Sequence, residues 1–171
     1  MKIHLRLVAL LLSFSISSFG QNANSKPLVR VFEGAKIQEI YRVVLDRDAL
    51  LLESIEGVIR DKRIQDGHVT VTAGSVQECT YHYVKSAGKK PTDVFQTVKG
   101  PFEILNAGGI IADGKPHIHI TIKEAGQTAI GGHLENGCKI LYLGEVTIFK
   151  YAGPSLTRRA NENGITLLDK K

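Results

Sequence analysis

Hydrophobic and polar residues alternate in short stretches along most of the chain beyond residue 39, which is the pattern of strands with one buried face. Many of the apolar positions carry β-branched residues, which favour strands. Glycine and proline pairs interrupt the pattern, and we expect turns there. The expected strands are residues 40–45, 68–72, 79–84, 94–98, 102–107, 115–123 and 139–150, and the expected breaks are Gly74-Ser75, Gly100-Pro101, Gly108-Gly109, Asp113-Gly114 and Gly153-Pro154.

One stretch shows helical periodicity instead. Leu51, Ile55 and Val58/Ile59 recur at intervals of three and four residues, which places them on one face of a helix. Asp46 is the expected N-cap and Gly67 the expected stop signal. A single main helix packed on a mostly antiparallel sheet is an α+β architecture. The tail, residues 155–168, is expected to form a short helix and a last extended piece.

Three of the six histidines fall between positions 117 and 133. If residues 115–123 form a strand, His117 and His119 point to the same face, because strand side chains alternate. The segment Glu124-Ala125-Gly126-Gln127 predicts a tight turn, and a register centred on Gly126 puts His133 directly across from His119. Three imidazoles so arranged predict a metal site with further positions open to water or a small-molecule ligand.

The register decides whether this metal site exists. A turn that is one residue shorter or longer would move His133 to the opposite face of the sheet. Gly131-Gly132 could still re-aim it, because glycines inside a strand often mark a bulge. The alternative interpretation is that the histidines are half-buried strand residues bonded to the backbone or to one another.

The first twenty residues have the pattern of a signal peptide. Lys2 and Arg6 form a basic start, residues 7–16 are apolar, and Ser18-Phe19-Gly20 offers small residues for cleavage. The apolar run is shorter than the roughly 20 residues that span a bilayer, so we expect a cleaved leader and no transmembrane segment in the mature chain. The protein is therefore expected to be secreted or periplasmic, with a lead-in over residues 21–39 and a single domain over residues 40–168.

The net charge identifies no class of partner, and the two cysteines leave their own pairing open. Without Lys2 and Arg6, the remaining 20 basic and 17 acidic residues give a formal charge of +3, which requires no anionic partner. Cys79 and Cys138 lie in apolar, strand-like stretches, which favours two buried free thiols. An exported protein also permits a disulfide, and the spacing leaves both possibilities open.

The order and spacing of several motifs resemble the PPC domain shared by plants and prokaryotes, which accompanies AT-hooks in plant nuclear proteins. The likeness covers roughly residues 41–150. The motifs are Gly100-Pro101-Phe102-Glu103-Ile104-Leu105, Pro116-His117-Ile118-His119-Ile120, Gly131-Gly132-His133-Leu134 with Gly137-Cys138, and Glu145-Val146-Thr147-Ile148.

This resemblance implies a compact α+β domain that assembles as a homotrimer, with His117, His119 and His133 as ligands of zinc or another divalent metal. Glu103 would either orient a ligand histidine or pair with an arginine across a subunit interface. In the plant proteins the AT-hook contacts DNA, and this sequence has no such Arg-Gly-Arg-Pro segment. We therefore expect a metal-binding protein of unassigned reaction. A DNA-binding protein and a structural trimerisation module without metal are the alternatives.

Overall fold

The structure, a computed structural model, describes residues 28–171, so the expected signal peptide lies outside the described residues. The chain divides into two units, Met1–Val31 and Phe32–Lys171, and the fold below is that of the second unit. Its elements are β1 (Lys36–Asp46), α1 (Leu51–Asp61), β2 (Asp66–Val84), β3 (Asp93–Ala112), β4 (Lys115–Glu124), β5 (Ile130–Leu134), β6 (Lys139–Ala152), β7 (Leu156–Ala160) and β8 (Thr166–Lys170).

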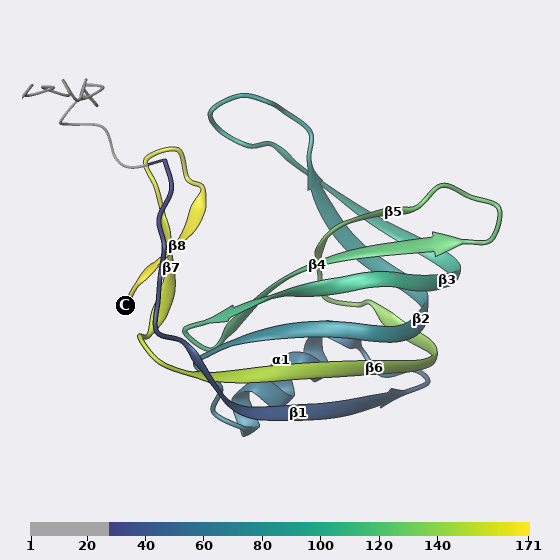
Figure 1. The fold of residues 1–171 in the computed structure, drawn as a ribbon. Coiled ribbons are helices and arrows are strands. Elements are labelled where there is room, and N and C mark those ends of the chain that lie inside the picture. The colour runs from purple at the N-terminus through teal and green to yellow at the C-terminus, as the bar shows by residue number, and fades with distance from the viewer. Residues whose placement is uncertain (1–27) are drawn as a thin grey trace, which may run out of the picture. The chain divides into compact units, whose positions relative to one another are not determined.

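Six strands form one antiparallel sheet in the order β1-β6-β2-β3-β4-β5. The far end of β2 also pairs with β5, at Tyr81 opposite Leu134 and His82 opposite His133. Strands β2 to β5 therefore close on themselves at this end. Figure 1 shows α1 lying against the sheet and the hairpin β7–β8 standing at one end of it. The structure thus confirms a mostly antiparallel sheet with one short helix.

Strand β4 shows how the sheet separates its core from its outer surface. Ile118, Ile120 and Ile122 are buried in the hydrophobic core, which α1 covers from one side. His117 and His119 alternate with these isoleucines and therefore point away from the core. The same alternation buries Tyr81 and Leu134 and leaves His82 and His133 half-buried on the outer face.

Three of the expected breaks lie inside strands. Gly100-Pro101 and Gly108-Gly109 both belong to β3, and Gly74-Ser75 likewise belongs to β2. A Cβ atom on Gly109 would lie 1.9 Å from the carbonyl oxygen of His117 on β4. Gly109 therefore marks a close approach between neighbouring backbones, which a single sequence does not distinguish from a turn. Asp113-Gly114 does form the expected turn, between β3 and β4, with φ values of 53° and 71°.

The helix has the expected buried stripe but different ends. Leu51, Ile55 and Ile59 are buried, which confirms the stripe. Asp46 does not cap the helix: it ends β1, and the N-cap is Leu50, which makes no side-chain capping bond. Gly67 is not the stop signal, since it lies within β2.

A Schellman motif ends the helix instead. Arg63 adopts the left-handed conformation, with φ of 50°, in the place that glycine usually takes. The N–H groups of Arg63 and Ile64 donate to the carbonyls of Arg60 and Ile59. Burial of Ile64 supplies the hydrophobic contact that accompanies this motif.

The tail forms a hairpin and no helix, which corrects the prediction for residues 155–168. The side chain of Asn161 accepts hydrogen bonds from the N–H groups of Asn163 and Ile165, and Gly164 has φ of 79°. These turn-forming contacts allow β7 and β8 to pair. No helix in the described part of the chain is long and apolar enough to cross a membrane.

Cys79 and Cys138 form a disulfide, so the preference for free thiols was wrong. Cys79 lies in β2 and Cys138 directly precedes β6, next to the paired residues Glu78 and Lys139. This pairing between distant parts of the chain brings the two thiols together. The bond closes a loop across 59 residues of sequence.

Candidate metal centre

The hairpin β4–β5 has the register expected from its turn. Gln127 N–H donates to the carbonyl of Glu124, Gly126 has φ of 74°, and His119 lies opposite His133. The ring centroids of His117, His119 and His133 are 4.8 to 5.6 Å apart. The structure therefore brings the three predicted histidines together on one face of the sheet. Their role as metal ligands stays a prediction.

A fourth histidine joins this group through the closure of β2 onto β5. His82 lies opposite His133 in the antiparallel register. The two rings stack with centroids 4.5 Å apart and planes inclined by 14°. We call His82, His117, His119 and His133 the histidine cluster.

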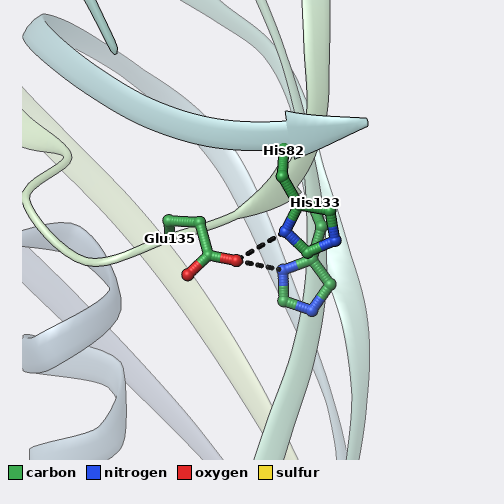
Figure 2. A group of neighbouring side chains, drawn as sticks. All are labelled: His82, His133 and Glu135. Carbon is green, nitrogen blue, oxygen red and sulfur yellow. Dashed lines mark hydrogen bonds and ion pairs between the residues drawn. The ribbon is translucent and has the colours of Figure 1, made fainter. Parts of the chain in front are cut away.

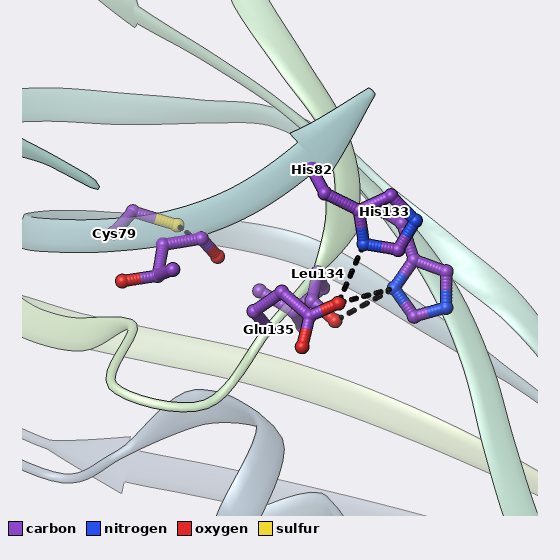
Figure 3. Close-up of polar contacts among 6 residues, drawn as sticks. Cys79, His82, His133, Leu134 and Glu135 are labelled. Carbon is purple, nitrogen blue, oxygen red and sulfur yellow. Dashed lines mark hydrogen bonds and ion pairs between the residues drawn. The ribbon is translucent and has the colours of Figure 1, made fainter. Parts of the chain in front are cut away.

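Glu135 lies beside two members of the histidine cluster, as Figure 2 shows. One of its carboxylate oxygens is 2.6 Å from Nδ1 of His82 and 3.5 Å from Nδ1 of His133. In Figure 3, Nδ1 of His133 also meets the carbonyl oxygen of Leu134, at 2.9 Å. Since a carbonyl oxygen only accepts hydrogen bonds, Nδ1 of His133 carries a proton, and the lowered pKa of this ring favours the form that keeps the lone pair on Nε2. Nε2 of His133 is therefore available to a metal.

There are two candidate ligand sets, and only one of them has its ligand atoms close together in the structure. Among residues 28–171, one group of three potential ligand atoms lies within 4.8 Å of one another, and it comprises His82, His133 and Glu135. The set predicted from the motifs is His117, His119 and His133, and both sets contain His133. Imidazole nitrogens and one carboxylate form a donor set that suits zinc, so the residues present fit a divalent metal.

The electrostatics of the cluster also suit metal binding. Burial is the main cause that lowers the pKa of His117 from 6.5 to about 4, and the charge of Arg158 and the neighbouring histidines contribute to the same shift. Burial lowers the pKa of His133 as well, although the hydrogen bond to Leu134 opposes this shift. Both rings are consequently neutral at pH 7, which is the form that binds a metal ion.

A cavity of about 710 Å³ opens beside the histidine cluster. The loop between β2 and β3 forms one wall, with Ser86, Gly88 and Pro91. The hairpin β7–β8 forms another, with Arg158 on β7 and Ile165 in the turn that leads to β8. The histidines thus face a space large enough for a small molecule.

A family model of the Plants and Prokaryotes Conserved (PCC) domain matches residues 32–152. The chain belongs to this family. The match confirms the resemblance to the PPC domain. It covers β1 to β6, the elements that hold the histidine cluster, and ends before the hairpin β7–β8.

Solved structures agree with membership of the PCC domain family. A metal-containing protein from Archaeoglobus fulgidus is 26% identical, with a TM-score of 0.71, and the match covers 83% of this chain and 100% of that one. A plant- and prokaryote-conserved (PPC) protein from Pyrococcus horikoshii is 18% identical, with a TM-score of 0.68 over 83% of this chain and 99% of that one. A candidate DNA-binding protein from Bacteroides thetaiotaomicron is 23% identical, with a TM-score of 0.69 over 79% and 94%. The last two likenesses concern the fold alone.

The chain also matches a part of a much longer curated protein. The bifunctional protein GlmU of a Synechococcus species is 26% identical over 110 residues, which are 64% of this chain and 16% of GlmU. The chain therefore spans about a sixth of the length of that relative, and the likeness assigns no activity.

Within this PCC domain, two residues of the candidate site were missed from the sequence. Glu135 could have been found, because it follows His133 by two positions, a spacing that places strand residues on one face. His82 carried no local signal, since its place depends on the pairing of β2 with β5. The carboxylate proposed from the motifs, Glu103, is exposed, lies opposite Lys123 and does not line the cavity. The structure therefore brings Glu135, and not Glu103, to the histidines.

Proposed function

We propose that this PCC-domain protein binds a divalent metal, zinc by preference, at the histidine cluster. The ligands in this proposal are Nε2 of His117, His119 and His133, with His82 beside them. The observation that supports it most directly is the fixed tautomer of His133, whose Nδ1 donates to Leu134 and whose Nε2 is left free. The Archaeoglobus fulgidus relative, named as a metal-containing protein, gives independent support.

Zinc suits this donor set better than magnesium or calcium, because imidazole nitrogen is a borderline ligand and those two cations prefer oxygen. Three protein ligands leave a coordination position for water or a small molecule, where a bound cation acts as a Lewis acid. His117 and His133 contribute neutral imidazoles at pH 7, so no proton has to be removed from them before binding. The reaction, if there is one, is not part of this proposal.

Zinc binding by single variants tests the proposal and separates the two ligand sets. Metal-free protein should take up one equivalent of zinc per chain, measured by calorimetry and elemental analysis. His119→Ala should lose most of the affinity, whereas Glu135→Gln should lose less, because Glu135 acts in this proposal through the rings it orients.

The reverse ranking of His119→Ala and Glu135→Gln would assign the metal to His82, His133 and Glu135. Stoichiometric zinc in both variants would contradict any site at the cluster. His68→Ala is the matched control, since His68 is a half-buried histidine of β2 that does not line the cavity.

We also propose that the mature protein is exported and assembles as a homotrimer. The basic and apolar pattern of residues 1–20 supports export, and the Cys79–Cys138 disulfide is compatible with an oxidising compartment. The exposed apolar residues Ile40 and Val44 on edge strand β1 are compatible with a subunit interface. Export predicts that protein from the native cell envelope begins at or near Gln21. Trimer formation predicts three times the mass of one mature chain in light scattering. Recovery of intact Met1 would contradict export, and a monomeric mass would contradict the trimer.

We do not propose nucleic-acid binding. The Bacteroides thetaiotaomicron protein is similar in fold, at an identity that carries no functional argument. We expect at most weak, sequence-independent binding to duplex DNA at physiological salt, as measured by fluorescence anisotropy. Submicromolar binding to a specific sequence would overturn this ranking.

A further inference from the structure

Arg158 lines the cavity without forming an ion pair with another described residue. It lies on β7, and it lines the same cavity as all four members of the histidine cluster. Its guanidinium donates one hydrogen bond, from Nη2 to the carbonyl of Thr166 at 3.2 Å. Among the described residues, none of the ion pairs involves Arg158. Partial burial lowers the pKa of its guanidinium below the usual value, a sign that this charge has lost part of its hydration.

The free donors of Arg158 suit one kind of ligand. A guanidinium carries five N–H donors, and Thr166 takes only one of them. The planar fork of the remaining donors matches the two oxygens of a carboxylate. Arg158 also shares the lining of this cavity with the four histidines. An anion held by Arg158 would therefore sit next to the cluster.

The remaining walls of the cavity indicate the rest of the ligand. Val84, Pro91 and Ile165 are apolar side chains that line it, together with Tyr83. A volume of about 710 Å³ far exceeds what an inorganic ion fills and lies in the range of small-molecule sites. The lining thus combines polar groups, among them Arg158 and the histidines, with several apolar side chains.

The side chains of the lining favour a monoanion. Arg158 is the one permanently cationic side chain among the described lining residues, and Asp93 adds a negative charge. Arg158 alone neutralises a carboxylate but only half the charge of a phosphate dianion, and a metal at the cluster would add positive charge for either anion.

We propose that Arg158 recognises the carboxylate of a small organic acid, which binds with its apolar part against Val84, Pro91 and Ile165 and its charged end facing the histidine cluster. This assignment rests on the proposed function, since the metal at the cluster would meet the same carboxylate. It names the class of ligand and adds a binding residue on β7, outside the segment that the PCC family model matches.

Calorimetric titration of the zinc-loaded protein with hexanoate tests the assignment. Hexanamide has the same body without the charge, and butyl phosphate and inorganic phosphate carry the competing anion. Arg158→Gln should weaken hexanoate binding about 10- to 100-fold, the effect of losing a charge-assisted bidentate pair. Arg158→Lys should restore only part of it, because a lysine keeps the charge and loses the fork.

Arg159→Gln is the matched control for Arg158→Gln. Arg159 is the next residue of β7, is exposed and does not line the cavity, so its loss removes the same charge from the opposite face. Hexanoate affinity should be unchanged in this variant. Zinc content, measured on every variant, should be unchanged throughout.

Equal weakening by the two arginine variants, or equal affinity for hexanoate and hexanamide, would overturn the carboxylate assignment. Tenfold tighter binding of butyl phosphate or inorganic phosphate would overturn it in favour of phosphate. Zinc-loaded protein that fails to bind hexanoate would contradict this assignment alone. A chain that binds no zinc but loses hexanoate binding with Arg158→Gln would contradict the metal site and leave the role of Arg158 standing.

Discussion

His82 and His133 stack face to face across the antiparallel pair β2–β5, with their ring centroids 4.5 Å apart. The Nδ1 atoms of both rings lie within 3.5 Å of the same oxygen of Glu135. This single carboxylate therefore orients half of the histidine cluster.

Glu135→Gln should weaken zinc binding about 10- to 100-fold, the usual effect of losing a carboxylate that orients a ligand histidine. The amide retains the shape of the side chain but loses the charge that holds Nδ1–H of His82. A competition titration with a chromophoric chelator would measure the change. Glu103→Gln is the control, because Glu103 is exposed and has no contact with the histidines. An equal loss in both variants would contradict the role given to Glu135.

The metal-free protein should lose stability as the pH falls from 6.5 towards 4. His117 has a folded pKa of about 4, below its ordinary value of 6.5, so the unfolded chain binds more protons in this range. The contribution of His117 to the free energy of unfolding is complete above pH 6.5 and disappears as the pH falls towards 4. Solvent screening reduces it to about 1–2 kcal/mol.

Urea unfolding at pH 7, 5.5 and 4.5 would measure this dependence. Asp66 changes the stability in the opposite direction, because burial raises its pKa. The pH dependence of the unmodified protein must therefore be compared with that of a variant. His117→Asn should flatten the dependence, because asparagine does not titrate. Identical slopes in the two proteins would show that His117 is not the source.

Replacing both Cys79 and Cys138 by alanine should lower the free energy of unfolding by about 2–4 kcal/mol, because the disulfide restricts the unfolded chain. The same change should weaken zinc binding, since Cys79 precedes His82 by three residues and Cys138 follows Glu135 by three. Chemical denaturation with and without reductant would measure the first effect in the unmodified protein. A reduced protein as stable as the oxidised one would contradict the disulfide.

Gly131→Ala should destabilise the protein and impair zinc binding together. A Cβ atom there would lie 1.9 Å from the carbonyl oxygen of Ile120, so β5 must move away from β4 and take His133 with it. We expect a loss of about 1–3 kcal/mol in thermal unfolding, the usual cost of overpacking.

Gly57→Ala is the contrasting substitution. Gly57 lies inside α1, and the nearest atom to an added Cβ is the flexible end of Arg60, at 3.7 Å. Alanine should stabilise the helix by about 0.5–1 kcal/mol and leave zinc binding unchanged. A stabilised Gly131→Ala variant, or a loss of zinc with Gly57→Ala, would contradict this account of the two glycines.

The spacing of residues along the sequence was sufficient to predict the features that depend on local geometry, namely the register of one hairpin and the buried face of the helix. The spacing of His119 and His133 about Gly126 predicted the register of β4–β5, because the length of a tight turn sets the pairing of its strands. The recurrence of Leu51, Ile55 and Ile59 predicted the buried face of α1, because residues three and four positions apart lie on one side of a helix. The order of the motifs was specific enough to identify the PCC domain family.

Contacts between distant parts of the chain decided the rest. The backbone of β4 beside Gly109 explains why this glycine lies within a strand, and the pairing of Glu78 with Lys139 brings Cys79 to Cys138. His82 reaches His133 only because β2 closes onto β5, and Arg158 reaches the cavity only because the tail forms a hairpin. The sequence by itself determined three of the four histidines in the cluster, because a single hairpin presents them. The fourth histidine and the arginine of the cavity were decided by the tertiary structure, since the first depends on how the sheet closes and the second on how the tail folds back.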